Sequence, residues 1–457
     1  MTKVQMSIRN STAARWTALC IVSFTMMAAY FFTDVMSPMK TLLESQMGWD
    51  SSDYGFFTSS YGWFNVLLFM LIFGGLILDK MGVRFTGVTS AALMVIGAGI
   101  KYYAIATPAM ASTLMFGINS QVMIASIGFA IFGVGCEVSG ITVSKIIVKW
   151  FRGKEMATAM GIQVALARIG TALALLLTVP VANLFKSSVA PSLSAPILLG
   201  AIALCAGLIA YFIYTFMDKK LDKEISDASE GESEESFRLA DVKMILTNKG
   251  FWLIALLCVL FYSCVFPFLK YASDLMVNKF SVDPDLAGAI PSLLPFGTIL
   301  LTPLFGGIYD KKGKGASIMI LGAFLLLFVH LMFSIPFLNN WILAVALMIV
   351  LGIAFSLVPS AMWPSVAKII PEKQLGSAYA LIFYIQNIGL MGVPYLVGKV
   401  LENFCKTTTA EGVISYDYTL VMLIFSGFAV LSIFVAFALK REDKKKGYGL
   451  EMKNVAD

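Results

Sequence analysis

The chain has 457 residues, of which 58% are hydrophobic and only 14% are charged. This composition excludes a soluble domain of this size and is typical of a membrane protein with many spans. The formal net charge of +6 does not indicate nucleic-acid binding. The basic residues instead follow a membrane pattern, so we expect a lipid bilayer and no nucleic acid as partner.

Apolar stretches long enough to cross a bilayer recur along the whole chain. Backbone polar groups must be paired within lipid, and the strand-length alternation that a barrel needs is not seen, so these stretches are predicted to be helices. The expected fold class is an all-α membrane protein with twelve transmembrane helices, over residues 16–37, 54–78, 85–107, 118–149, 155–180, 193–216, 250–278, 287–308, 316–336, 340–369, 374–400 and 417–440.

Positive charge is distributed asymmetrically about these spans. If the N-terminus is cytoplasmic, 26 of the 34 lysines and arginines fall in the tails and in the loops that follow even-numbered spans. Under the positive-inside rule, this asymmetry predicts that both termini are cytoplasmic.

A polar stretch rich in Lys, Glu, Asp and Ser divides the twelve spans into six and six. The expected organisation is an N-terminal six-helix bundle over residues 1–216, a cytoplasmic linker over 217–249, a C-terminal six-helix bundle over 250–440 and a cytoplasmic tail over 441–457.

The two halves share a short motif. The string from Asp79 to Arg84 follows the second span, and a related string from Asp310 to Lys314 follows the eighth. An aspartate in such a turn can accept hydrogen bonds from a neighbouring helix N-terminus. We therefore expect Asp79, Arg84 and Asp310 to take part in conformational change. Pseudo-symmetric six-helix repeats around a midplane site are the architecture of rocker-switch transporters.

Two charged residues lie deep within apolar segments. Glu137 precedes the end of its span by roughly 18 Å of helix, and Arg168 lies roughly 20 Å into the next span. In a hydrocarbon core of about 30 Å, both fall near the midplane, where an unpaired charge is costly. They predict a polar cavity for a zwitterionic substrate. The alternative is a buried ion pair that only fixes helix packing.

Four further residues are candidates for the cavity. Gln386 and Asn387 are near the midplane of the eleventh span and could hydrogen-bond a peptide backbone, or they could hold helices together. Trp363 and Tyr61 are candidate cavity walls, although aromatic residues in membrane helices more often serve in packing.

Asp34 and Lys270 occupy matching places in the first and seventh spans, about 27 Å from the inner surface. We interpret them as an outer gate that closes through a salt bridge, or as part of the substrate path; the alternative is two separate charges without a partner. Lys101 in the third span is expected to extend its ammonium group to the membrane surface.

The turn from Asp79 to Arg84 resembles the signature of the major facilitator superfamily. Longer strings resemble one branch of it, the lysosomal dipeptide uniporters of the major facilitator domain-containing protein family and their bacterial relatives. These strings are residues 135–137, 150–155, 167–170, 265–268, 363–367, 371–379 and 385–390.

The resemblance implies transport of dipeptides and other short peptides without obligatory ion coupling. It also implies that Glu137 engages the amino end of the peptide and Arg168 its carboxylate. Arginine suits a carboxylate because its planar fork can bind both oxygens. No cofactor is implied, and a monomer without an accessory subunit is expected.

The chain differs from that branch in its expected cellular location. The tails lack an acidic dileucine sorting signal, and the sequon at Asn10 is on the predicted cytoplasmic side, so a bacterial inner or plasma membrane is expected rather than a lysosome. The first span also lacks the Glu-x-x-Glu-Arg string of proton-coupled peptide symporters, which favours uniport.

Other functions remain open from the sequence alone. A proton-coupled carrier of organic anions or sugar acids could use Arg168 for a carboxylate and Glu137 for a proton. A receptor or scaffold could have kept the fold without flux. An enzyme has little support, because neither a nucleophile–histidine pair nor a phosphate loop is present.

Overall fold

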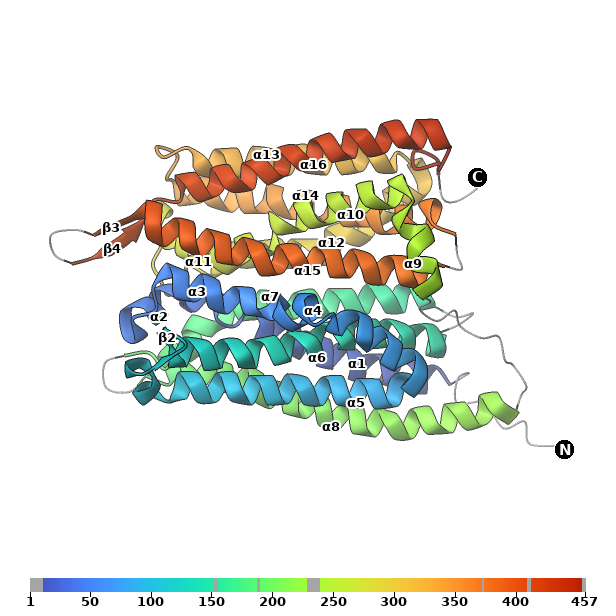
Figure 1. Ribbon diagram of the computed structural model, residues 1–457, viewed down its shortest axis with the longest axis horizontal. Coiled ribbons are helices and arrows are strands. Elements are labelled where there is room, and N and C mark those ends of the chain that lie inside the picture. The colour runs from blue at the N-terminus through green and yellow to red at the C-terminus, as the bar shows by residue number, and fades with distance from the viewer. Residues whose placement is uncertain are drawn as a thin grey trace.

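The computed structural model describes residues 11–151, 155–186, 190–227, 239–371, 374–408 and 412–453. Parts of the predicted linker (228–238) and tail (454–457) therefore lie outside the described residues, as do 152–154 and 372–373 of the quoted strings. Two groups of near-parallel helices lie side by side, the first half of the chain below the second in Figure 1.

The first half of the chain is helical apart from one two-stranded hairpin. Its elements are α1 (Thr12–Asp34), η2 (Ser37–Met39), α2 (Lys40–Met47), α3 (Ser51–Ser59), η3 (Ser60–Gly62), α4 (Trp63–Leu67), α5 (Met70–Ala106), η4 (Pro108–Ser112), β1 (Leu114–Met115), β2 (Ile118–Asn119), α6 (Ser120–Phe151), α7 (Met156–Leu184) and α8 (Ser194–Asp227).

The second half is also helical and has a second antiparallel hairpin, which here precedes the last helix. Its elements are α9 (Leu239–Leu246), α10 (Lys249–Ser263), α11 (Phe266–Phe280), α12 (Ala289–Lys312), α13 (Gly315–Ser334), α14 (Trp341–Ile369), α15 (Leu375–Val400), η6 (Leu401–Cys405), β3 (Lys406–Thr408), β4 (Ile414–Tyr416) and α16 (Thr419–Lys446).

Eleven helices of the described residues are long and apolar enough to cross a membrane. The predicted second span differs from a simple helix, because it is divided among α3, η3, α4 and the start of α5. Helix α5 then continues through Gly82, whose φ of 76° and ψ of 174° are not helical, into the predicted third span. The all-α membrane fold expected from the sequence is confirmed, and this division accounts for the difference between eleven and twelve.

Three predicted boundaries differ from the helices. Helix α8 continues past residue 216 to Asp227, and α16 continues past residue 440 to Lys446. The predicted seventh span consists of two helices, α10 and α11, which are separated at Cys264 and Val265. Pro267 lies in the first turn of α11, where a proline without an amide hydrogen is well tolerated.

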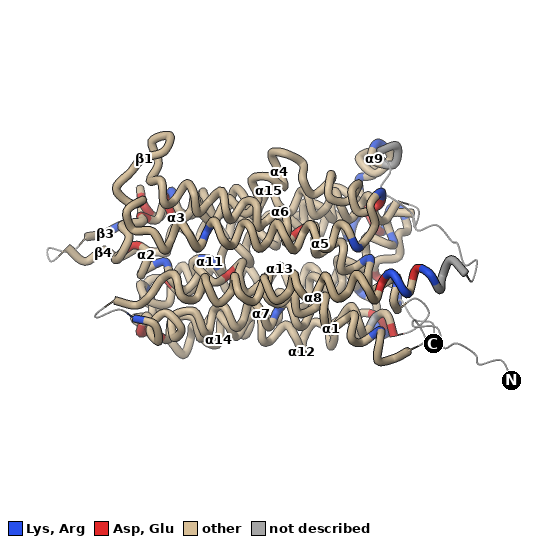
Figure 2. The backbone as a smooth tube through the Cα atoms, turned by 90° about the horizontal axis from the view of Figure 1, so that it is seen from below, with Lys and Arg blue, Asp and Glu red and all other residues tan. Residues whose placement is uncertain are grey.

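The helices run between two ends of the molecule. Both hairpins lie at one end, the left of Figure 1, and we call this the hairpin end; α9 and the end of α16 lie at the other, which we call the linker end. Charged residues gather at both ends, and the central band contains few of them (Figure 2). This distribution is the one that a bilayer requires.

The two halves contact each other closely through glycines near the hairpin end. A Cβ atom added to Gly55 in α3 would lie 2.8 Å from the Cα atom of Gly398 in α15. A Cβ atom on Gly288, just before α12, would lie 2.0 Å from the carbonyl oxygen of Leu175 in α7. Only glycine permits these backbone approaches, so the halves are packed tightly at this end.

Candidate functional site

Glu137 lies in α6 and is half-buried. Its carboxylate accepts a hydrogen bond from the hydroxyl of Tyr61, at 2.7 Å. The side chain of Asn387, from α15 in the other half, is a further polar neighbour of the same carboxylate. Asn387 is fully buried, and its Oδ1 has no hydrogen-bond partner among the described residues. The structure thus brings together three of the predicted site residues, from both halves.

Arg168 lies in α7 and faces aromatic rings. Its guanidinium carbon is 4.9 Å from the ring centroid of Phe355 in α14, 5.4 Å from that of Phe266 in α11 and 5.9 Å from that of Tyr30 in α1. Stacking of this kind stabilises a cation without neutralising it. The guanidinium has no ion pair or hydrogen bond to another described residue, so its donors are free to bind an anion.

Glu137 and Arg168 do not form an ion pair with each other. Among the described residues, the carboxylate is held by an uncharged hydroxyl and the guanidinium by ring faces. The interpretation of the two residues as a simple structural ion pair is therefore wrong for this conformation. One acidic and one basic side chain thus lie inside the bundle without pairing with each other.

Trp363 in α14 and Gln386 in α15 are the two remaining predicted site residues, both from the second half. The indole nitrogen of Trp363 donates to the hydroxyl of Tyr262 at 3.1 Å, and the Tyr262 ring contacts Phe355 at 5.7 Å between centroids. These rings form a continuous aromatic wall that ends at Arg168. Gln386 is buried and accepts a long contact, 3.6 Å, from the thiol of Cys258. Whether Trp363 and Gln386 bind substrate stays a prediction.

Sequence reasoning missed the aromatic residues around Arg168. Phe266 belongs to one of the strings that carried the family resemblance, but the resemblance assigned it no role. Tyr30 and Phe355 lie in apolar spans, where aromatic residues are common, and no local pattern distinguishes them from packing residues. Their position around Arg168 follows only from tertiary contacts between α1, α7, α11 and α14.

Asp34 and Lys270 form a salt bridge between the two halves. The Lys270 ammonium lies 2.5 Å from Asp34 Oδ1 and also donates to the carbonyl of Thr33 at 2.7 Å. Both side chains are nearly buried, at 11% and 12% exposure. The alternative of two charges without a partner is wrong for this conformation, whereas a role for the pair in gating stays a prediction.

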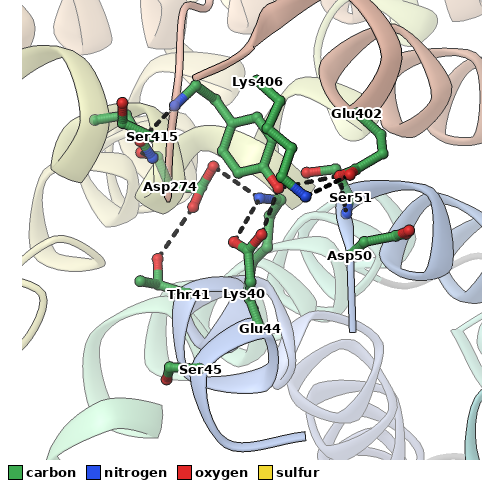
Figure 3. Close-up of polar contacts among 12 residues, drawn as sticks. Lys40, Thr41, Glu44, Ser45, Asp50, Ser51, Asp274, Glu402, Lys406 and Ser415 are labelled. Carbon is green, nitrogen blue, oxygen red and sulfur yellow. Dashed lines mark hydrogen bonds and ion pairs between the residues drawn. The ribbon is translucent and has the colours of Figure 1, made fainter. Parts of the chain in front are cut away.

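A second polar cluster joins the halves at the hairpin end (Figure 3). The carboxylate of Asp274 in α11 accepts hydrogen bonds from Lys40 and Thr41 of α2, each at 3.0 Å, and from the hydroxyl of Tyr418. Lys40 and Asp274 are each 2% exposed. Since these groups come from opposite halves, the hairpin end is closed by a buried ion pair in addition to the Asp34–Lys270 bridge.

The predicted motif residues of the first half lie at the linker end in a charge network. Asp79 pairs with Lys145 at 3.0 Å, and Arg84 pairs with Asp222 at 2.5 Å and with the buried Asp218 at 3.4 Å. Met81 to Arg84 line a cavity of about 160 Å³ with Lys145, Lys149, Asp218 and Asp222. Asp310 lies at the equivalent place near the end of α12.

The expectation for Lys101 was wrong. Its side chain is fully buried and donates to the carbonyl of Phe32 at 3.2 Å. Its ammonium lies 4.1 Å and 4.5 Å from the ring centroids of Phe32 and Phe129. Cation–π contacts make this burial tolerable, so the ammonium does not need to reach the membrane surface.

Curated relatives match over most of the chain. The lysosomal dipeptide transporter MFSD1 of Homo sapiens is 28% identical over 396 residues, which cover 86% of this chain and 81% of the relative.

Solved structures share the fold at low sequence identity. A bacterial homologue of the human lysosomal transporter Spinster, in an inward-facing and occupied conformation, superposes with a TM-score of 0.71 at 13% identity and covers 95% of this chain and 98% of its own. The xylose transporter XylE from E. coli gives a TM-score of 0.67 at 14% identity, over 93% and 99% of the two chains.

The family model described as Major Facilitator Superfamily matches residues 19–394 and 272–454, which together take in most of the chain. With twelve predicted spans in two halves, a multi-pass membrane fold and transporters as relatives, the chain belongs to the Major Facilitator Superfamily and is a membrane transporter.

Proposed function

We propose that this protein carries dipeptides or similarly small zwitterionic peptides by rocker-switch alternating access, as a uniporter. Glu137 would bind the peptide ammonium and Arg168 its carboxylate, with the aromatic wall from Trp363 to Phe355 beside the peptide. The single observation that carries the proposal is that these two opposite charges lie inside the bundle, both half-buried and not paired with each other.

The surroundings of each anchor support this assignment. Asn387 approaches Glu137 from the second half, and Phe266 and Phe355 of the second half stack on Arg168. A peptide bound between the anchors would therefore contact both halves, as a rocker-switch mechanism requires. The similarity to relatives named as dipeptide transporters points to the same substrate class.

We also propose a membrane topology for the protein. The distribution of basic residues favours placing the linker end in the cytoplasm together with both termini, in a bacterial inner or plasma membrane. The cross-half contacts at the hairpin end then close the outer face, and movement of residues 1–216 against 250–440 would open it.

Thermal unfolding of the purified protein with single ligands tests the substrate. A ligand that binds the native state raises the melting temperature by mass action. Alanylalanine should stabilise the protein, and its N-acetylated and C-amidated derivatives should not. Free alanine is the matched small zwitterion, and it should stabilise less because it cannot reach both anchors.

The second candidate function is a carrier of organic anions or sugar acids. The guanidinium of Arg168, which is not paired with a carboxylate, favours it. Glucuronate is therefore included in the panel. Stabilisation by glucuronate and by N-acetyl-alanylalanine, but not by the free dipeptide, would replace the peptide proposal. In that case Glu137→Gln should retain binding, whereas the two-anchor model requires that it lose binding.

A further inference from the structure

The hydroxyl of Tyr416 lies between two carboxyl groups from opposite halves. It contacts Oε1 of Glu44, on α2 of the first half, and lies 3.2 Å from Oε2 of Glu402, in η6 of the second half. Glu44 and Glu402 lie within the cluster shown in Figure 3. This arrangement is separate from the Asp34–Lys270 bridge and from the site of Glu137 and Arg168.

The number of hydrogens in this arrangement is informative. A phenol has one hydrogen and can donate one hydrogen bond, and ionised carboxylates can only accept. Burial, with the contact to Glu44, holds the pKa of Tyr416 well above its usual value, so the group is a hydroxyl. One hydroxyl cannot bond to two ionised carboxylates at once. Both contacts are hydrogen bonds only when one carboxyl group carries a proton.

Glu402 is the carboxyl group that stays ionised. Its Oε1 accepts from the ammonium of Lys406 at 2.5 Å, and its Oε2 accepts from the backbone amide of Ser51 at 3.1 Å. These donors stabilise the charged form on both oxygens. Tyr416 then donates its single hydrogen to Glu402.

Glu44 is the carboxyl group that holds the extra proton. Its nearest ammonium is that of Lys40, at 3.9 Å, which is beyond hydrogen-bonding distance. That ammonium is already bound to Asp274 at 3.0 Å. The Glu44 side chain is only 13% exposed, so water does little to stabilise a charge on it.

The other charged groups that face Glu44 do not change this assignment. They are Lys40 on its own helix, Asp274 from α11 and Lys406 from β3. Each lysine has its own carboxylate, Asp274 for Lys40 and Glu402 for Lys406. Because each ammonium is already paired, the two lysines do little to stabilise a negative charge on Glu44.

We propose that Glu44, Tyr416 and Glu402 form a proton-binding site that is complete only when the hairpin end is closed. The proposal rests on alternating access but not on any particular substrate. When the halves separate, Glu44 leaves Tyr416 and enters water, where a glutamate holds its proton only below about pH 4.3. Closing therefore takes up a proton and opening releases it.

The consequence is a closed state that is favoured at low pH. Because the closed state binds one more proton, the ratio of closed to open molecules rises up to about tenfold for each pH unit that is lowered. The effect is lost as pH rises until Glu44 is ionised in both states. A proton on the outer face would thus hold the carrier open towards the linker end.

The test measures conformation rather than flux. Spin labels are attached at Ser45→Cys on α2 and Thr408→Cys on β3, two exposed positions in opposite halves, after the six native cysteines are replaced. The distance distribution is recorded without substrate, from about pH 5 to about pH 8. The short-distance population of the wild-type chain should grow as pH falls.

Three variants make the test specific. Glu44→Gln keeps an amide that can donate to Tyr416, so it should show the short distance throughout the pH range. Tyr416→Phe removes the shared hydroxyl and should lose the pH response. Asp53→Asn is the control. Burial raises the pKa of Asp53 to about 6, so this acid at the same end also titrates within the pH range of the test. If Glu44 is the responding group, the pH response of Asp53→Asn should match that of the wild type.

The outcomes separate this proposal from the proposed function. A wild-type distance that ignores pH, an unchanged response in Glu44→Gln, or a response lost in Asp53→Asn would each overturn the proton site. None of these results depends on whether dipeptides bind. Conversely, failure of alanylalanine to stabilise the protein would leave the pH response of the label distance in place.

Discussion

Arg168 and Phe355 belong to opposite halves of the chain, and the guanidinium of one stacks on the ring of the other at 4.9 Å. The cation is thus desolvated by ring faces and is not neutralised by a carboxylate. A substrate carboxylate that reaches the guanidinium would gain charge-assisted hydrogen bonds that no described side chain supplies. The same contact joins α7 of the first half to α14 of the second half.

The geometry of the Arg168 fork should matter as well as its charge. Arg168→Lys keeps the positive charge but loses the planar donors and the stacked face. Charge-assisted hydrogen bonds contribute about 1.5–3 kcal/mol, so the apparent affinity for alanylalanine should fall roughly 10- to 100-fold. Binding is measured by calorimetry, and Lys186→Arg, in a loop near the hairpin end, is the matched control. Unchanged affinity in Arg168→Lys would remove the bidentate role.

Tyr61 should hold Glu137 in its binding position. Tyr61→Phe deletes the hydroxyl that donates to the carboxylate at 2.7 Å and leaves the ring in place. The apparent affinity for the dipeptide should fall by about tenfold, because the anchor loses one charge-assisted hydrogen bond. Tyr103→Phe, at a ring that is 58% exposed, should bind as the wild type. Equal affinities in the two variants would contradict the positioning role.

The Asp34–Lys270 bridge should couple the halves energetically. Asp34→Lys and Lys270→Asp each replace a nearly buried salt bridge by two like charges. Breaking a buried salt bridge costs about 3–5 kcal/mol. Both single variants should melt at lower temperature, and the exchanged double variant should recover much of the loss. Additive losses in this cycle would show that the two residues act independently.

Gly170 should be required for the packing that places Arg168. A Cβ atom at Gly170 would lie 2.1 Å from the carbonyl oxygen of Met27 in α1, so Gly170→Ala must push the two backbones apart. Overpacking of this kind costs about 1–3 kcal/mol. Gly161→Ala is the matched control in the same helix, since a Cβ atom there has no neighbour within 4 Å. The melting temperature should fall for the first variant only; equal values would contradict the close contact.

The sequence predicted the fold through features that depend on composition and spacing. Apolar length predicts the spans, the polar linker predicts two halves, and the repeated Asp-Lys-x-Gly turn predicts their relationship. Glu137 and Arg168 stood out for a related physical reason, because a charge inside an apolar segment needs an explanation.

Features that depend on tertiary contacts could not be read in this way. Lys40 in α2 pairs with Asp274 in α11, and Glu402 in η6 accepts a hydrogen bond from the backbone amide of Ser51 in α3. The partners in each of these contacts are distant in sequence, and no local pattern joins them. The burial of Lys101 depends on rings from α1 and α6. A charged side chain within an apolar span indicates that it needs a partner, but the sequence does not show which residue that partner is.

Flux of labelled alanylalanine into proteoliposomes is the measurement that tests dipeptide transport itself. A dipeptide uniporter with these anchors should show saturable uptake down a dipeptide gradient without a pH gradient. Other free dipeptides should inhibit uptake, end-blocked ones should not, and well-folded Arg168→Ala and Glu137→Gln proteins should lose it. Retained flux in either folded variant, or uptake only when a proton gradient is imposed, would contradict a dipeptide uniporter with these two anchors.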